Sequence, residues 1–178
     1  AFKPRVLRDV ERIDTSTTIF DNKIDLPVFF APIGSMQDFV NDGAIPSTLS
    51  AAKNKIFHML SSTWSGGIEL VGNAIDYPKL FQLYVRGDQQ WVFDQISKAI
   101  DNGFIALCLT VDLDAYGRRE RDLAKRYKTT SRKSTIDPRY QMNFSWKDVE
   151  KIKNKFEIPI IIKGIATVED SILAIENG

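Results

Sequence analysis

Polar and reactive side chains recur at the ends of short apolar runs in this sequence. Successive runs end in Gly34 and Ser35, Ser61 and Ser62, Gln82 and Tyr84, Thr110 and Asp112, and finally Lys163. Hydroxyl, amide, carboxylate and ammonium groups of this kind can hold the polar edge of a ligand or support proton transfer. Because parallel strands of one sheet end at the same edge, we expect these side chains to belong to one site.

The elements that must position these residues alternate along the chain from Pro27 onward. The apolar runs cover residues 28–32, 56–60, 80–85, 104–112 and 158–163. Segments of helical period follow at residues 45–55 and 68–74, and after Asp88, Ser145 and Thr167. This alternation predicts repeated βα units and a parallel sheet.

Local signals mark the start of three of these helices. Ser145 and Asp148 have the spacing of a capping box. Thr167 and Asp170 repeat that spacing before the last helix. Asp88 can cap an amphipathic helix whose apolar face contains Val92, Ile96, Ala99 and Gly103.

Two architectures fit this alternation, a doubly wound sheet and a (β/α)₈ TIM barrel. Reactive residues at the C-terminal ends of successive strands favour the barrel, where these ends converge on one mouth. We therefore interpret residues 1–178 as a single, incomplete barrel domain. Residues 1–26 lead into it, and residues 27–178 supply βα units 1 to 5. Five units cannot close an eight-stranded barrel, so we expect further segments to complete it.

The composition excludes several classes of protein. A chain of 178 residues with 43% hydrophobic content and a net charge of +1 is neither disordered nor dedicated to nucleic acid. No run reaches the roughly 18 to 20 apolar residues of a membrane-spanning helix, although peripheral membrane contact stays open. The single cysteine, Cys108, cannot form an internal disulfide, which favours an intracellular location.

The segment from Arg118 to Lys133 carries an excess of arginine and lysine. It suits an anionic partner, such as a lipid surface or an acidic redox protein, or else a solvated loop beside an anion-binding mouth. We favour the solvated loop. His58 and Cys108 lie within apolar runs, and we interpret both as structural residues.

Taken in order, the motifs of this chain resemble those of the FMN-dependent 2-hydroxy-acid oxidases and dehydrogenases. This family includes glycolate oxidase, lactate oxidase, mandelate dehydrogenase and flavocytochrome b2. The resemblance implies a flavoprotein oxidoreductase with a TIM barrel, FMN as cofactor, and oxidation of a small (S)-2-hydroxy acid to the 2-oxo acid. The motifs that carry it are Ala31-Pro32-Ile33-Gly34, Leu60-Ser61-Ser62, Phe81-Gln82-Leu83-Tyr84, Thr110-Val111-Asp112, Gly117-Arg118-Arg119-Glu120, Ser145-Trp146-Lys147-Asp148 and Ile162-Lys163-Gly164.

The resemblance also implies a role for each candidate residue, and no metal ligands. In the substrate set, Arg119 binds the carboxylate, Tyr84 hydrogen-bonds the substrate, and Asp112 orients the catalytic base. Arginine suits this task because it offers a carboxylate a fork of parallel N–H donors. A flavin needs fixed donors and acceptors at its pyrimidine edge and a positive charge near N1 and O2. The flavin-binding set comprises Ser61, Gln82 and Thr110 at that edge, Lys163 beside the reduced ring, and the backbone of Ile33 and Gly34.

The catalytic histidine of the family is not among these residues. The resemblance places it after Gly178, in a Ser-Asn-His-Gly-Gly-Arg type motif, so we expect the chain alone to be inactive. The resemblance also implies a homotetramer, and reoxidation by oxygen, a quinone or a cytochrome. Two alternatives are an aldolase-like lyase that forms a Schiff base with Lys163, and a non-catalytic half-barrel. The stretch between Arg126 and Ser145 is shorter than in typical members of the family.

Overall fold

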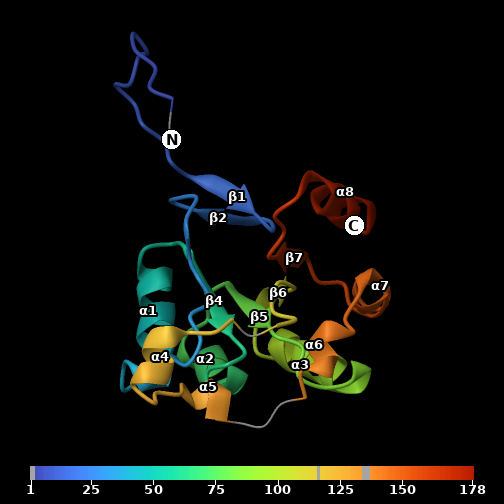
Figure 1. Ribbon diagram of the computed structural model, residues 1–178. Helices are drawn as coiled ribbons and strands as arrows, with labels where there is room; N and C mark the ends of the chain where they lie inside the picture. The colour runs from blue at the N-terminus through green and yellow to red at the C-terminus, as the bar shows by residue number, and fades with distance from the viewer. Residues whose placement is uncertain (1–2, 116, 134–136) are drawn as a thin grey trace.

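Five parallel strands form the main sheet of this protein, and their order in space is their order in the sequence. The computed structural model describes residues 3–115, 117–133 and 137–178 (Figure 1). Sequential order is typical of a barrel, because a doubly wound sheet reverses its order at a switch point. The predicted barrel class is therefore confirmed, and the sheet is a curled half-barrel. Its strands are β3 (Phe29–Phe30), β4 (Phe57–Ser61), β5 (Lys79–Leu83), β6 (Phe104–Thr110) and β7 (Ile160–Lys163).

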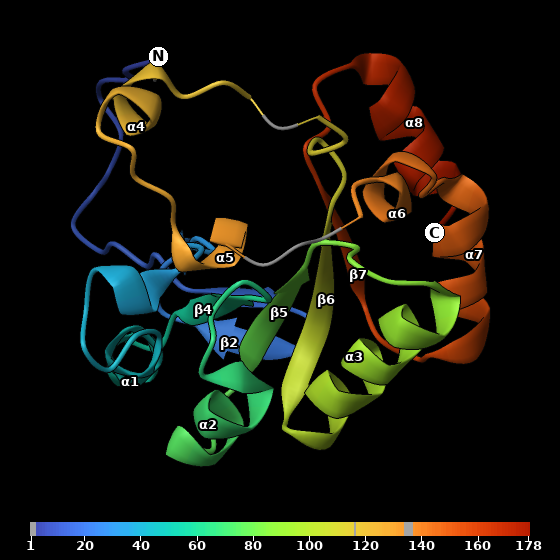
Figure 2. The same ribbon diagram turned by 60° about the horizontal axis from the view of Figure 1, so that its bottom comes forward.

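A helix follows each strand of the sheet. These helices are α1 (Ile45–Lys53), α2 (Gly67–Ala74), α3 (Gln89–Asp101), α7 (Trp146–Lys155) and α8 (Val168–Glu176). Figure 2 shows α1, α2, α3 and α7 along one side of the sheet. The predicted helix starts are confirmed, since Asp88 accepts a hydrogen bond from Trp91 N at 2.9 Å and Thr167 accepts one from Asp170 N at 3.1 Å. At the third helix, the Asp148 carboxylate accepts a hydrogen bond from Ser145 N at 3.0 Å.

The sequence-based boundaries differ from the observed ones at a few positions. Gly103 does not extend the apolar face of α3, because the helix ends at Asp101 and Gly103 has a φ of +76°. That conformation is typical of a glycine just beyond a helix. The first strand is only two residues long, because Pro27 and Pro32 flank it and lack the N–H group that a strand ladder needs.

Side chains alternate between the two faces of the sheet and build two apolar cores. The core between sheet and helices contains Leu60, Phe81, Leu83, Leu107 and Leu109, with Val71, Val92, Ile96 and Ile152 from the helices. The core on the concave face contains Phe57, Met59, Leu80, Ala106 and Cys108. Residues two further along the same strands therefore continue this concave face, up to the C-terminal rim of the sheet.

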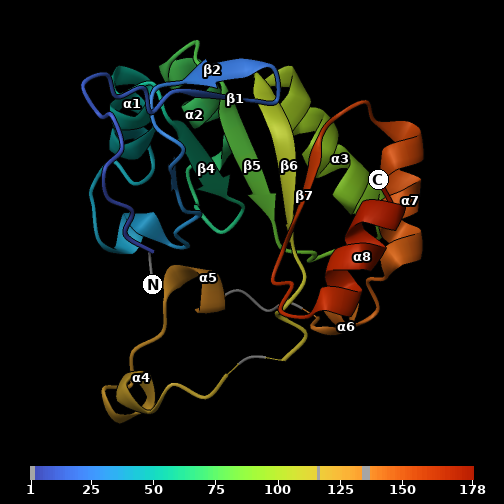
Figure 3. The ribbon, with the colours of Figure 1, turned by 90° about the horizontal axis from the view of Figure 1, so that it is seen from above.

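A small hairpin covers the opposite end of the sheet. Strands β1 (Thr17–Ile19) and β2 (Asn22–Ile24) pair antiparallel around Phe20 and Asp21, whose φ values are 49° and 59°. Ile24 is fully buried in the concave-face core. Figure 3 shows the hairpin crossing the N-terminal ends of β4, β5 and β6. This hairpin was not predicted from the sequence, and it closes the end of the half-barrel away from the reactive residues.

Within the described residues, four short helices lie outside the βα repeat. They are η1 (Met36–Asp38), α4 (Glu120–Ala124), α5 (Thr130–Lys133) and α6 (Arg139–Met142). Both α4 and α5 lie beyond the C-terminal ends of the strands (Figures 2 and 3). The Asp38 carboxylate accepts hydrogen bonds from Thr130 N, at 2.8 Å, and from the Thr130 hydroxyl, which ties α5 to η1. No helix in the described ranges has the length and apolarity that crossing a bilayer requires.

Candidate functional site

Four of the predicted site residues form one arc along the C-terminal rim of the concave face. Ser61 is the register partner of Gln82, and Thr110 is the register partner of Lys163. Gln82 Nε2 donates a hydrogen bond to Thr110 Oγ1 at 2.8 Å. The arc therefore crosses four adjacent strands, from β4 to β7, without a gap.

Gln82 carries an acceptor whose hydrogen bonding is incomplete. Its side chain is 0% exposed, and Oε1 has no hydrogen-bond partner among the described residues. A buried carbonyl oxygen without a donor costs on the order of 1 to 3 kcal/mol, and such atoms are rare in folded proteins. Gln82 Oε1 therefore marks a place where the N–H group of a ligand would stabilise the site.

The loop after β3 lies against the start of this arc. A Cβ atom built on Gly34 would lie 2.6 Å from Thr63 Oγ1 and 4.0 Å from Ser61 Oγ. Ser61 Oγ is in turn 2.9 Å from Thr63 Oγ1, and both side chains are buried. A side chain at position 34 would disturb this contact, so the small residue lets the backbone of Ile33 and Gly34 approach the rim.

Lys163 and Asp112 lie next to one another where β6 and β7 end. Both residues are exposed, and Val111 N donates a hydrogen bond to Lys163 O at 2.9 Å. A Cβ atom on Gly164 would lie 2.7 Å from Asp112 Cγ, and Gly164 has a φ of +119°. Glycine is thus required there for two reasons, the backbone conformation and the contact with the Asp112 side chain.

Tyr84 follows β5 directly and extends the same rim. Its N–H group donates a hydrogen bond to Ser62 Oγ at 3.1 Å. Tyr84 also lines a small cavity together with Leu113 and Gln141. The structure therefore places Tyr84 at the mouth of the half-barrel, beside the arc.

Arg119 is not brought to the other site residues. It occupies the N-cap position of α4, is exposed, and precedes a segment that lies away from the strand ends (Figures 2 and 3). Neighbouring Arg118 pairs with Glu120 at 2.5 Å on the surface. The structure therefore brings the arc residues and Tyr84 to one rim of the sheet, and it does not bring Arg119 there. The physical reason is that α4 has no buried residue to hold it in one place.

His58 and Cys108 have the structural roles expected of them. His58 is 2% exposed, and its Nδ1 is 2.8 Å from Thr48 Oγ1 on α1. Burial lowers the pKa of His58 to about 4, so the imidazole is neutral near pH 7. Burial likewise raises the pKa of the Cys108 thiol to about 11, which leaves no reactive thiolate.

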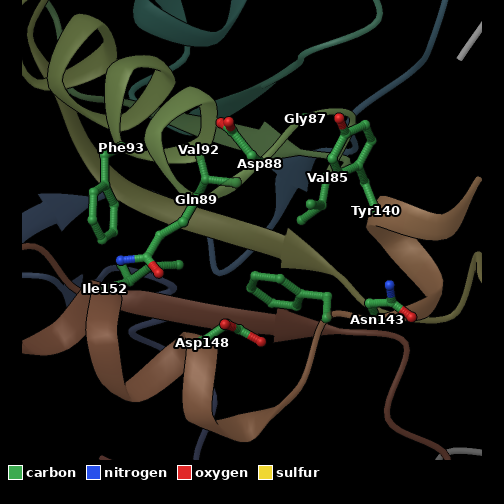
Figure 4. A pocket seen from close by; sticks show the side chains of 11 residues that line it. Val85, Gly87, Asp88, Gln89, Val92, Phe93, Tyr140, Asn143, Asp148 and Ile152 are labelled. Carbon is green, nitrogen blue, oxygen red and sulfur yellow. The ribbon is translucent and has the colours of Figure 1, made fainter. Parts of the chain in front are cut away.

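Two larger cavities lie outside the sheet and include none of the arc residues. One, of about 140 Å³, lies between α3, α6 and α7 (Figure 4). Its two carboxylates are engaged as helix caps, Asp88 with Trp91 N and Asp148 with Ser145 N. The other, of about 300 Å³, lies between β7, α7 and α8 and is lined largely by Trp146, Val149 and Ile162. Neither cavity is lined by a described residue whose buried side chain lacks a hydrogen-bond partner.

Gln141 contacts the rim beside the arc and was not predicted from the sequence. Its Oε1 accepts a hydrogen bond from Val85 N at 2.9 Å, and its Nε2 donates one to Thr110 O at 3.0 Å. The two bonds span 56 and 31 residues of sequence. A glutamine in a short polar stretch without apolar period gives no sequence signal for such a contact.

The comparison with known sequences assigns the whole chain to one family. The family model described as FMN-dependent dehydrogenase matches residues 1–178. Glycolate oxidase 5 of Oryza sativa subsp. japonica is 31% identical over 199 aligned positions, and Glycolate oxidase 3 of Arabidopsis thaliana is 30% identical. Each alignment covers 99% of this chain and 54% of the relative. The chain therefore spans about half the length of the curated relatives it matches.

Solved structures show the same relationship. A crystal structure of mandelate oxidase superposes with a TM-score of 0.87 at 25% identity, covering 99% of this chain and 53% of that one. Mandelate oxidase with (S)-2-phenylpropionate gives a TM-score of 0.85 at 27% identity, covering 99% and 52%. The curled half-barrel thus has the same fold as about half of the chain of each of these oxidases.

Proposed function

Because this chain belongs to the FMN-dependent dehydrogenase family, we propose that the whole protein oxidises a 2-hydroxy acid to the 2-oxo acid. The relatives are named glycolate and mandelate oxidases, so the proposed substrates are small or aryl 2-hydroxy acids and the proposed electron acceptor is oxygen. The family depends on FMN, which when bound accepts the two electrons and the Cα hydrogen of the substrate.

The observation that carries this proposal is the unsatisfied acceptor of Gln82 within the polar arc. A flavin pyrimidine edge presents an N–H donor between two carbonyl oxygens. Gln82 Oε1 is buried and without a partner among the described residues, and it therefore suits that N–H group. Gln82 Nε2 and the Thr110 hydroxyl, which are 2.8 Å apart, supply the neighbouring polar atoms. The residues present thus fit the cofactor that the family requires.

Lys163 would act as the electrostatic partner in this site. Lys163 is the last residue of β7 and the register partner of Thr110. A fixed positive charge stabilises negative charge that develops beside it during the reaction. The backbone of Ile33 and Gly34 would contact the opposite part of the ring system, since Gly34 lies close to Thr63 beside Ser61.

Substrate handling would fall to the exposed rim residues. Tyr84 would hydrogen-bond the substrate, and Asp112 would orient the base and stabilise its protonated form. Arg119 would bind the carboxylate through two parallel N–H bonds, which requires α4 to move toward the strand ends. The base itself is not His58, because that imidazole is buried against Thr48 on the outer side of β4. We propose that the base comes from the part of the protein that corresponds to the unmatched length of the relatives.

Purification of the full-length protein and assay with oxygen tests this proposal. We expect a bound flavin with absorbance near about 450 nm, and production of a 2-oxo acid and hydrogen peroxide in equal amounts. Glycolate, lactate and mandelate form the substrate panel, and the corresponding 2-oxo acids serve as controls without an oxidisable hydroxyl. A protein that holds no flavin, or that oxidises none of these hydroxy acids, would contradict the proposal.

A further inference from the structure

The Gln141 side chain connects two strands at the rim of the site. The ladder between β5 and β6 has its last register pair at Leu83 and Leu109. Just beyond that pair, Val85 N donates to Gln141 Oε1 at 2.9 Å, and Gln141 Nε2 donates to Thr110 O at 3.0 Å. A side-chain amide thus makes both a donor and an acceptor contact where a peptide group would otherwise continue the ladder.

The directions of the surrounding backbone groups show why the amide fits between these strands. Consecutive peptide groups of a strand point to opposite neighbours. Gln82 O accepts from Ser62 N on the β4 side, and Val111 N donates to Lys163 O on the β7 side. Val85 N and Thr110 O therefore face each other across the gap between β5 and β6, and Gln141 fills that gap.

We propose that Gln141 is a positioning residue, which fixes the separation of the β5 and β6 ends and thereby the placement of Tyr84 and Thr110. This inference rests on the proposed function, because it concerns the same site. The Thr110 hydroxyl accepts a hydrogen bond from Gln82, and the Thr110 carbonyl accepts one from Gln141. The three residues are therefore connected by hydrogen bonds. Tyr84 immediately precedes Val85, the residue after β5 that is bonded to Gln141.

The chemistry of the amide makes this role specific to glutamine. Glutamate keeps the acceptor for Val85 N but replaces the donor to Thr110 O with an acceptor. Leucine has a similar volume and makes neither bond. A displacement of reacting groups by about 1 Å can lower a rate roughly 100-fold, so even a modest separation of the strand ends should alter turnover.

The test uses the full-length, FMN-loaded protein with the variants Gln141→Leu and Gln141→Glu. Gln90→Leu is the matched control, because Gln90 is an exposed glutamine on α3 whose side chain donates to Asp94 at 2.7 Å, within its own helix. Hydrogen–deuterium exchange at Val85, the visible flavin spectrum, and kcat and KM are measured for each protein. Thermal unfolding shows whether a variant is folded.

We expect Gln141→Leu to keep its flavin, to exchange the Val85 amide faster, and to lose roughly tenfold or more in kcat/KM with a shifted flavin band. Gln141→Glu should keep slow exchange at Val85 and still lose activity, because only its bond to Thr110 is gone. A purely structural role would change the thermal stability of the variants. It would leave kcat/KM and the flavin band as they are in Gln90→Leu.

The inference would be overturned if both Gln141 variants had the same kinetics and the same flavin spectra as Gln90→Leu. If Gln141→Leu does not accumulate as folded protein, Gln141→Glu decides by the same comparison. Failure of the proposed function can be distinguished from failure of this inference, because it appears in the wild-type protein as absent flavin or absent hydroxy-acid oxidation. Such a failure would remove this inference as well.

Discussion

Gln82 Nε2 donates a hydrogen bond to Thr110 Oγ1 at 2.8 Å, across adjacent strands, and leaves Gln82 Oε1 buried without a partner among the described residues. The bond fixes the orientation of the amide, so the acceptor is held ready for an external N–H donor. This arrangement joins the fold to the proposed chemistry, since the half-barrel brings together two residues that are 28 positions apart.

Replacing Gln82 should therefore weaken FMN binding. Gln82→Leu removes the acceptor and the bond to Thr110, and we expect the Kd for FMN to rise roughly tenfold or more, since a buried N–H group of the flavin left without an acceptor costs about 1 to 3 kcal/mol. Quenching of flavin fluorescence during titration of the apoprotein measures this Kd. Gln90→Leu is the control, and equal affinities for the two variants would show that Gln82 does not contact the flavin.

Lys163 should affect the rate of oxidation more than cofactor binding. Lys163→Met removes the charge that would stabilise the reduced site, and we expect kcat to fall about 100-fold with KM little changed. Lys147→Met, on the exposed side of α7, is the control.

Borohydride treatment with substrate should give no covalent adduct at Lys163, whereas a trapped adduct would indicate the aldolase-like alternative.

Arg119 provides a test of movement in the segment that carries α4. If Arg119 reaches the substrate carboxylate during catalysis, Arg119→Lys should raise KM about tenfold or more, because lysine cannot form the paired N–H contacts. Steady-state kinetics on the full-length protein measure the effect. Arg121→Lys, two residues further along, should leave KM close to wild type, and identical behaviour of the two variants would remove Arg119 from the substrate site.

His58 should make stability depend on pH. Its pKa is about 4 in the folded protein, against 6.5 for an unperturbed histidine side chain, so the unfolded chain takes up a proton first as the pH falls. The free energy of unfolding should therefore decrease between about pH 6.5 and pH 4, by on the order of 2 kcal/mol from pH 7 to pH 5. Urea unfolding of wild type and His58→Asn measures this, and the variant should show a smaller decrease. Equal decreases in both proteins would contradict the assignment.

Features that depend on local sequence could be predicted. Asp88, Ser145 and Thr167 cap helices as their spacing indicates, because capping involves only the next three residues. The polar ends of the apolar runs reach one rim because parallel strands of one sheet share their direction. The resemblance in motif order added the roles of the arc residues toward a flavin.

Features that depend on distant contacts could not be predicted. The β1–β2 hairpin is defined by the burial of Ile24 in the concave-face core, which involves strands far along the chain. Gln141 bonds to the backbone N–H of Val85 and the backbone carbonyl of Thr110. Such backbone groups are the same in nearly every residue type, so the sequence does not indicate which of them a side chain contacts. Arg119 was expected at the site because of its motif, yet its exposed helix does not hold it there.

Electron transfer from a 2-hydroxy acid to the bound flavin can be followed by anaerobic mixing of the full-length protein with that acid. We expect the flavin absorbance near about 450 nm to disappear on mixing, with one equivalent of 2-oxo acid formed per flavin. The absorbance should persist when the 2-oxo acid is added instead. A flavin band unchanged by every hydroxy acid of the panel would contradict the claim that this half-barrel belongs to a hydroxy-acid oxidising site.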